Sequence, residues 1–430
     1  MSAAITIALL GGGTVGSAVA KLLVENSEDL AARIGRPIKI AGIAVRDASK
    51  PRGSIDPSLI TTDAQALAAS GADIVIEVIG GIEPAKSLIE SAIANGSSVV
   101  TANKALLASH GAELHAKAVA AGVDLFYEAS VAGAIPLLRP LRESLAGDKV
   151  RRVLGIVNGT TNFILSKMYD DGADYADVLA QAQALGYAEA DPTADVEGFD
   201  SAAKAAILAG LAFHTNVTID DVSREGMSKV SALDIAAAKS LGCVIKLLAI
   251  AELTDDEAGI IVRVHPTMVP NSHPLASVRD AFNAVFVEAQ AAGQMMFYGR
   301  GAGGNPTASS VLGDVVAAAR NKVAGSVDPG QSDYADLEIH NVGEAKTSYY
   351  LNLRVVDEPG VLAAISSEFA RHGVSIQALR QDDVDADAHL VIRTHGAIDQ
   401  DLQATVESLR NMSEVRDVLG VMRVENGVSA

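Results

Sequence analysis

Short apolar runs alternate with longer amphipathic stretches through the first third of the chain. Strands are predicted at the apolar runs Ile5–Leu10, Ile38–Val45, Ile74–Ile79, Val99–Val100 and Val123–Tyr127, and helices at Ser17–Leu30, Glu83–Ala94 and Lys104–Ala121. Such alternation is typical of a doubly wound parallel sheet, whose strands are covered by helices on both faces. The predicted fold class is therefore α/β, with a Rossmann-type domain over residues 1–135.

The pattern changes from about Val150 onward. It predicts a strand at Val150–Val157, helices at 161–169, 175–185 and 199–213, and another strand at Ile260–Val264. The apolar run Leu241–Ile250, which holds the single cysteine Cys243, is interpreted as helical. We therefore predict an α+β domain over residues 136–310. A helix at 311–322 should pack back on the first domain, and the polar, turn-rich stretch 326–347 is interpreted as a linker.

The last 80 or so residues form a separate pattern. Strands are predicted at Tyr349–Val356, Val374–Leu379, Ala388–Arg393 and Val415–Val424, with helices at Gly360–His372 and Leu402–Met412. The order β-α-β-β-α-β is that of a ferredoxin-like domain. This third domain is predicted to span residues 348–430.

Composition excludes several classes of function. A net charge of −19 argues against nucleic acid and anionic membranes as partners. Apolar runs stay well short of the roughly 20 residues that a membrane span needs. Residues Met1–Leu10 lack the basic start of a signal peptide, and one cysteine cannot form a disulfide within the chain. Both observations favour a cytoplasmic protein.

A glycine fingerprint, Gly11-x-Gly13-x-x-Gly16, lies between the first predicted strand and helix. In this context the glycines, with Thr14 and Val15, predict that the pyrophosphate of a dinucleotide sits on the helix N-terminus. After the second strand, where an acidic residue would select NAD, the chain has Arg46. An arginine there suits the 2′-phosphate of NADP. Because Arg46 could also be a solvated loop residue, NAD remains open.

Three further polar segments lie where strands are predicted to end. Thr101 and Lys104 follow one strand, and Lys104 could reach a substrate or nicotinamide or simply begin a surface helix. Residues 158–162, Asn-Gly-Thr-Thr-Asn, could bind a small polar ligand or cap a helix. Glu128 stands beside a turn whose carbonyls could hold a hard cation. A second glycine-rich turn, Gly301–Gly304, could close over the cofactor or only reverse the chain.

The predicted helix 199–213 carries only two charged residues, Asp200 and Lys204. Residues four apart share one face of a helix, so the carboxylate and the ammonium should be neighbours. With no other charge on the helix, Lys204 is expected to be at least partly desolvated and held by the carboxylate, a setting that can tune an amine for proton transfer. The alternative is an ordinary ion pair on a buried helix.

Taken together, these motifs resemble homoserine dehydrogenase of the monofunctional type with a C-terminal ACT domain. The resemblance runs the length of the chain and rests on residues 11–16, 101–104, 127–133, 157–162, 186–204 and 301–304. It implies reversible NAD(P)-dependent interconversion of L-aspartate 4-semialdehyde and L-homoserine, within threonine, methionine and isoleucine biosynthesis. The middle domain would then bind substrate, catalyse and dimerise.

The resemblance also implies roles for individual residues. Lys204 matches the catalytic lysine, with Asp200 orienting it and Lys104 near substrate and nicotinamide. Either lysine could deliver the proton, and Lys204 is favoured. The residues implied in substrate binding are Gly186, Glu189, Asp195 and Asp200, and Gly303 matches a cofactor-contacting glycine. A sodium site is implied at Glu128, Val131, Gly133 and Ile135. One departure is that Ala194 precedes Asp195 where some relatives have two adjacent acids, so only one acid carries over.

The last domain contains the turn Asp357-Glu-Pro359-Gly360-Val361-Leu362, which resembles the ligand loop of ACT domains. It implies feedback inhibition, with threonine as the expected effector, although a purely dimerising domain is the alternative. The apolar middle domain and the sheet edge of the last domain both favour a homodimer or homotetramer.

Three other functions share parts of this pattern. Aspartate-semialdehyde dehydrogenase needs a thiol nucleophile, and Cys243 in its apolar run does not fit that role. Another amino acid dehydrogenase of the same architecture remains open. So does a non-catalytic sensor of nucleotide and amino acid, against which the joint presence of Lys104, Glu189, Asp200 and Lys204 argues.

Overall fold

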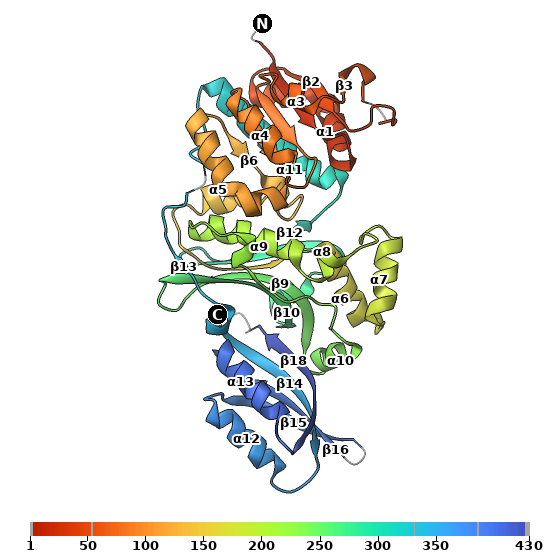
Figure 1. Cartoon of the computed structure of the whole chain (residues 1–430), viewed down its shortest axis with the longest axis vertical. Helices are drawn as coiled ribbons and strands as arrows, with labels where there is room; N and C mark the ends of the chain where they lie inside the picture. The colour runs from red at the N-terminus through yellow and green to blue at the C-terminus, as the bar shows by residue number, and fades with distance from the viewer. Residues whose placement is uncertain (1–2, 53–54, 331, 385–386, 426–430) are drawn as a thin grey trace. The chain divides into compact units, whose positions relative to one another are not determined.

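The computed structural model describes residues 3–52, 55–330, 332–384 and 387–425 (Figure 1). The chain folds into two compact units, each assembled from three separate segments. The first unit comprises Met1–Gly159, Ala202–Val222 and Phe282–Leu337, and the second comprises Thr160–Ser201, Ser223–Ala281 and Glu338–Ala430.

A six-stranded parallel sheet forms the centre of the first unit, in the order β3-β2-β1-β4-β5-β6. Its strands are β1 (Ile5–Leu10), β2 (Ile38–Ala44), β3 (Ile60–Thr61), β4 (Ile74–Glu77), β5 (Ser98–Thr101) and β6 (Leu125–Phe126). The chain order reverses between β1 and β4, so this pair marks the switch point at whose carboxyl end nucleotides bind in such sheets. The predicted α/β class with a Rossmann-type sheet is confirmed.

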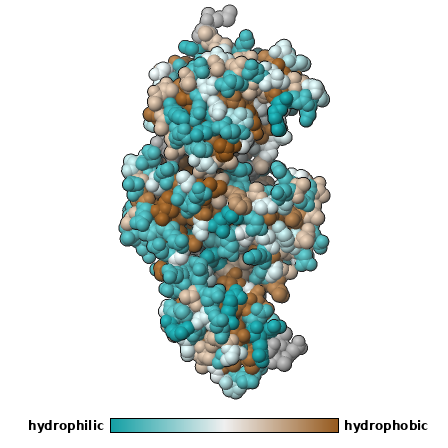
Figure 2. Space-filling model, viewed as in Figure 1, coloured by the Kyte–Doolittle hydropathy of each residue, from teal (hydrophilic) through white to brown (hydrophobic). Residues whose placement is uncertain are grey.

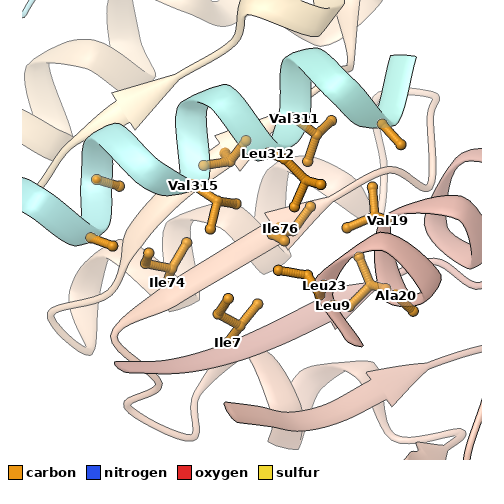
Figure 3. Close-up of a cluster of buried hydrophobic side chains, with 14 of the residues drawn as sticks. Ile7, Leu9, Val19, Ala20, Leu23, Ile74, Ile76, Val311, Leu312 and Val315 are labelled. Carbon is orange, nitrogen blue, oxygen red and sulfur yellow. The ribbon is translucent and has the colours of Figure 1, made fainter. Parts of the chain in front are cut away.

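Helices pack on this sheet through one continuous core. The helices of this part are α1 (Thr14–Glu25), α2 (Ser27–Ile34), α3 (Ala64–Ala68), α4 (Ala85–Ala94), α5 (Lys104–Ala121) and α11 (Gly304–Ala324). Val311 and Val315 of α11 lie over Ile7 and Ile74 of the sheet (Figure 3). Each such fully buried side chain contributes on the order of 1.5–3 kcal/mol. The late helix α11 is therefore part of the nucleotide-domain core.

The first unit also holds a three-stranded antiparallel group. It consists of β7 (Val150–Ile156), β11 (Phe282–Ala289) and β12 (Gly293–Arg300), with β11 in the middle. Most of the long helix α9 (Phe199–Phe213) belongs to this unit as well. The hairpin β11–β12 was absent from the sequence prediction.

In the second unit, six strands are ordered β9-β10-β18-β14-β16-β15. They are β9 (Cys243–Leu253), β10 (Gly259–Pro270), β14 (Lys346–Val356), β15 (Ile376–Val384), β16 (Asp387–Thr394) and β18 (Val415–Val424). The last four, with α12 (Val361–Arg371) and α13 (Asp399–Arg410), form the expected ferredoxin-like domain. Its strand β18 pairs in parallel with β10, Arg423 opposite Thr267, so this domain's sheet continues into that of β9 and β10.

The remaining elements of this unit surround β9 and β10. They are the helices α6 (Gly159–Asp171), α7 (Tyr175–Ala184), α8 (Thr193–Val196) and α10 (Ala232–Ser240), and the short strands β8 (Ser223–Arg224), β13 (Glu338–Ile339) and β17 (Ala397–Ile398). Helix α9 begins in this unit at Phe199 and continues into the first.

The helical interpretation of the run around Cys243 was wrong, because this segment is strand β9. Residues Cys243–Ala251 are all buried, so both faces of the strand are covered and no period-2 alternation is visible in the sequence. Gly242, with φ +65°, separates the strand from α10. The conclusion about the thiol is unaffected, since Cys243 is 2% exposed and burial raises its pKa.

Large apolar side chains at the surface are scattered among hydrophilic ones on the face shown in Figure 2. Among all described residues, the exposed large apolar side chains include Val24, Leu233 and Tyr298. Single exposed apolar residues are ordinary in globular proteins. Within the described part of the chain, no helix has the length and apolar character of a membrane span.

Candidate functional site

The glycine fingerprint is shaped by close backbone approaches. A Cβ at Gly11, where φ is +112°, would lie 2.9 Å from the Val78 carbonyl oxygen, and one at Gly16 would lie 1.9 Å from that of Gly11. Gly13 is exposed, and no described heavy atom lies within 4 Å of where its Cβ would be. Because Gly13 has no side chain to cap α1, the first amides of the helix, at Thr14 and Val15, are left for another acceptor. This geometry fits a pyrophosphate.

The second glycine-rich turn lies against the first one. A Cβ at Gly304 would come within 3.2 Å of the Thr14 side chain, and Gly303, with φ +126°, caps α11. On its other side the turn is tight against Gly133, whose Cβ would lie 2.3 Å from the Gly301 carbonyl oxygen. The turn therefore does more than reverse the chain, since it brings a second helix N-terminus to the fingerprint.

Two arginines follow strand β2. Arg46, two residues beyond the strand, is exposed. Arg52 was not singled out from the sequence, although it follows the basic pair Arg46 and Lys50. Its guanidinium donates to the carbonyl oxygens of Gly12 at 3.2 Å, Asp47 at 2.8 Å and Lys50 at 2.9 Å. Arg52 thereby ties the loop after β2 to the fingerprint.

A buried glutamate organises the carboxyl ends of β4 and β5. Glu77 is fully buried, and its carboxylate accepts from the Thr101 hydroxyl at 2.6 Å and from the amides of Ile79 and Gly80 at 2.7 and 3.1 Å. The Thr101 hydroxyl is therefore directed inward. Lys104 is half-buried and begins α5 at this edge of the sheet. The sequence signal for Glu77 was its position as the only charge in an apolar strand.

In the loop predicted to bind a cation, the carboxylate of Glu128 binds backbone amides of the following turn. The Glu128 carboxylate accepts three backbone amides, from Leu137, Leu138 and Arg139, at 2.5, 2.7 and 2.9 Å. Its own amide donates to Asp314 at 2.8 Å. The side chain of Glu128 thus holds the next turn of the backbone.

The rest of this loop offers main-chain oxygens. Ala132 and Gly133 have φ of +56° and +55°, and the Gly133 carbonyl accepts from the Ser310 hydroxyl at 2.7 Å. Val131 and Ile135 are buried beside them. Any cation here would therefore depend on carbonyl oxygens. Among the described residues, no three His, Cys, Asp or Glu side chains gather in a way that could hold a metal ion.

The side chain of Lys204, on helix α9, is buried, as the scarcity of charges on that helix predicts. It is 8% exposed, and its Nζ donates to the carbonyl oxygen of Val157 at 2.6 Å. Val157 directly precedes the Asn-Gly-Thr-Thr-Asn segment. Asp200, also 8% exposed, lies one turn earlier on the same helix. The amine of Lys204 is thus largely shielded from water, and its hydrogen bond to the Val157 carbonyl oxygen fixes its orientation.

The remaining predicted substrate residues lie on the segment between α7 and α9. Gly186, with φ +76°, follows α7, and the side chain of Glu189 is exposed three residues later. The Gln183 amide donates to the Glu189 carbonyl oxygen at 3.0 Å and so holds this segment on α7. Asp195 is half-buried on the short helix α8. The segment is further held by Thr160, whose hydroxyl donates to the Tyr187 carbonyl oxygen at 2.6 Å.

The predicted effector loop connects β14 to α12. Gly360, with φ +99°, caps α12, while Asp357, Pro359 and Leu362 are exposed and Val361 enters the domain core. In the same domain Arg423 of β18 donates to the buried Asp399 at 2.8 Å. It also reaches Glu225, beyond the ferredoxin-like domain, at 2.9 Å.

Family models match most of the chain. A model described as homoserine dehydrogenase, NAD binding domain, matches residues 11–128, one described as homoserine dehydrogenase matches 136–316, and one described as ACT domain matches 349–414. A homoserine dehydrogenase of Corynebacterium glutamicum is 57% identical over 98% of this chain and 96% of its own length. The chain belongs to the homoserine dehydrogenase family.

Solved homoserine dehydrogenases share the fold. That of Thiobacillus denitrificans is 40% identical, with a TM-score of 0.93 over 99% of both chains. A hyperthermophilic archaeal homoserine dehydrogenase, solved in complex with NADPH, is 26% identical, with a TM-score of 0.63 over 76% of this chain and 100% of its own. This chain is thus an NAD(P)-dependent homoserine dehydrogenase of amino-acid biosynthesis with an ACT domain, rather than a sensor or an aspartate-semialdehyde dehydrogenase.

Proposed function

We propose that Lys204 transfers the proton when this enzyme interconverts L-aspartate 4-semialdehyde and L-homoserine. The observation that carries the proposal is the buried amine with its 2.6 Å hydrogen bond to the Val157 carbonyl. When bound, a reduced nicotinamide supplies the hydride that reduces the aldehyde carbon. Lys204 donates a proton to the alkoxide oxygen that develops there and takes it back in the reverse direction. The Val157 carbonyl holds one N–H of the ammonium, which orients the others.

The substrate is an amino acid, so both of its charged groups need partners. Glu189 and Asp200 are proposed to bind its ammonium, with Asp195 and the backbone at Gly186 completing this part of the site. Support comes from the anchoring of this segment by Gln183. Lys104 is proposed to meet the substrate carboxylate and the nicotinamide, because it begins α5 at the carboxyl edge of the sheet.

NADP is the proposed cofactor, with NAD as the alternative. The open cradle at Gly13 and the adjoining N-terminus of α11 support pyrophosphate binding at Gly11–Gly16 and Gly303. The exposed Arg46 is available for the 2′-phosphate. The archaeal relative solved with NADPH is consistent with this choice. Thr101 would contact the cofactor through its backbone, since its hydroxyl serves Glu77.

A sodium ion is proposed at the carbonyl oxygens of Glu128, Val131, Gly133 and Ile135. The turned backbone at Ala132 and Gly133 supports this site, because hard cations are bound by oxygen ligands. Replacing sodium by a bulky organic cation at constant ionic strength should then lower activity or thermal stability, and an unchanged enzyme would contradict the site.

Regulation and assembly are proposed for the ACT domain. Threonine is the proposed effector at Asp357–Leu362, with a homodimer or homotetramer as the working state. The exposed Leu362 beside a glycine-capped helix start supports this loop as a contact surface. Domain boundaries at 1–135, 136–310, 326–347 and 348–430 and a cytoplasmic location are proposed with it. The single, buried cysteine suits a reducing compartment.

The deciding experiment measures NADPH oxidation with L-aspartate 4-semialdehyde, with and without millimolar threonine. Turnover suppressed by threonine supports both the substrate assignment and a functional ACT domain. Turnover that ignores threonine would leave that domain to assembly or to another effector. Folded protein that turns over neither nicotinamide would contradict the proposed reaction.

A further inference from the structure

A second buried lysine, Lys246, lies in the interior of the second unit. It stands on β9, is 1% exposed, and belongs to no motif. Its Nζ donates to the side-chain oxygen of Asn162 at 2.8 Å and to the carbonyl oxygen of Val278 at 2.5 Å. Two acceptors from different parts of the chain thus meet one amine. A lysine is seldom placed in such an interior unless it holds partners there.

The charged groups around Lys246 come from two segments. Burial, together with the positive charge of Arg279, lowers the pKa of Lys246 to about 7, while Asp170 on α6 and Asp280 raise it. Arg279 and Asp170 also form an ion pair at 3.3 Å. In either protonation state the amine retains hydrogens for both acceptors.

Asn162 is the last residue of the Asn-Gly-Thr-Thr-Asn motif and lies in the first turn of α6. It is 1% exposed, and its Nδ2 donates to the Asp280 carbonyl oxygen at 2.9 Å. Its amide group is therefore committed to the interior, with Lys246 on the oxygen and the 278–280 segment on the nitrogen. This fixes the rotation of the first turn of α6 about the helix axis.

On the opposite side of the same turn, Thr160 and Phe163 contact Tyr187, which lies on the segment between α7 and α9. The Thr160 hydroxyl donates to the Tyr187 carbonyl oxygen at 2.6 Å, and the Phe163 ring lies 5.0 Å from the Tyr187 ring. Tyr187 follows Gly186 directly and precedes Glu189 by two residues. A rotation of this turn would therefore move the backbone that carries Glu189.

We propose that Lys246 is a positioning residue for the amino acid substrate, acting through Asn162 and the first turn of α6 on the Tyr187–Glu189 segment. The inference rests on the proposed function, in which Glu189 binds the substrate ammonium. Lys246 does not touch substrate or cofactor. Its loss takes a donor from the Asn162 side-chain oxygen and leaves the Val278 carbonyl oxygen with the longer, 3.4 Å bond from Asn162 Nδ2, so the first turn of α6 is held less firmly.

The test is Lys246→Met in the full-length enzyme, assayed with homoserine and NADP. Methionine keeps the length and apolar stem but cannot donate. We expect the KM for homoserine to rise at least about tenfold, because displacements of this kind in a support impair substrate alignment strongly. The KM for NADP should stay within about twofold, since the nucleotide cradle lies in the first unit.

Lys239→Met is the matched control. Lys239 is exposed on α10, and its ammonium lies 4.8 Å from the Tyr169 ring of the same helix α6. It should change neither KM. The double variant Lys246→Met with Asn162→Leu also removes the Nδ2 that donates to the Asp280 carbonyl oxygen, so its thermal stability should fall at least as far as that of Lys246→Met. The raised KM for homoserine should persist, because the tether is still missing.

Glu189→Gln separates this inference from the proposed function. If it leaves the KM for homoserine unchanged, the substrate assignment is at fault. If Glu189→Gln raises that KM but Lys246→Met does not, the role of Lys246 is refuted. The role is also refuted if both KM values of Lys246→Met rise together, or if the double variant returns the homoserine KM to that of the wild type, since Lys246 would then serve stability alone.

Discussion

Replacing Lys204 by methionine gives the most direct test of the proton-transfer proposal. Methionine retains the apolar stem within α9 and removes the Nζ that donates to Val157 at 2.6 Å. Two effects follow from that one atom, and they are measured separately. One is the loss of a hydrogen bond from a buried carbonyl, and the other is the loss of the proton donor.

The two magnitudes differ enough to be told apart. An unpaired buried carbonyl costs roughly 1–3 kcal/mol of stability. Loss of a general acid lowers kcat by about 10²–10⁴, equivalent to roughly 2.7–5.4 kcal/mol in the activation barrier. We therefore expect a moderate fall in the unfolding midpoint and a far larger fall in kcat. The KM for the nucleotide should hardly change.

The assay follows reduced nicotinamide under saturating substrate, with urea unfolding measured on the same preparations. Lys167→Met is a suitable control, because this lysine pairs with Asp171 on α6 and is one-third exposed. Lys204→Ala adds a second test, since small primary amines in the buffer should restore part of its turnover. A Lys204→Met enzyme that keeps kcat within about threefold of the wild type would refute general acid catalysis by this residue.

Three other predictions concern the cofactor, pH and regulation. Arg46→Ala should raise the KM for NADPH far more than that for NADH, and equal changes would contradict a 2′-phosphate contact. Burial raises the pKa of Asp314 to about 7 despite its ion pair with Arg139, whereas the unfolded value is about 3.9. Between these two values the folded state binds a proton that the unfolded state has lost, so the stability that this proton provides is lost as pH rises through the window. Urea midpoints should accordingly fall more between pH 5 and 8 in the wild type than in Asp314→Asn, and parallel falls would disprove this. Glu225→Gln, which breaks the 2.9 Å ion pair to Arg423, should weaken inhibition by threonine roughly two- to fivefold without changing uninhibited turnover. Unchanged inhibition would show that the ion pair between Arg423 and Glu225 does not couple threonine binding to turnover.

Strands with clear flanking signals were predictable from the sequence. Ile5–Leu10 and Val415–Val424 have the same bounds in the structure as in the prediction. The hairpin of β11 and β12 was missed because part of what stabilises its turn lies far away in the chain. The amides of Ala291 and Ala292 donate to the carboxylate of Asp148, and no local pattern reveals that partner.

The candidate site shows the same division. Gly11 and Gly16 could be located from the sequence because neither position has room for a Cβ, and the spacing of the glycines in the fingerprint reflects this requirement. Lys246 could not, because its importance depends on acceptors at Asn162 and Val278 that only the fold brings together. The sequence therefore predicts the residues that define a motif better than the buried residues whose contacts hold that motif in place.

The position of α11 has a consequence for how the enzyme is made. Val311 and Val315 complete the core around Ile7 and Ile74, although residues 127–303 separate α11 from the last strand of the sheet. A nascent chain that has just emerged through β6 would still expose the apolar side of its sheet. Contacts of such high sequence separation slow folding and leave intermediates prone to aggregation. We therefore expect the N-terminal segment to depend on chaperones until α11 has been synthesised, and a fragment ending near residue 135 to be insoluble.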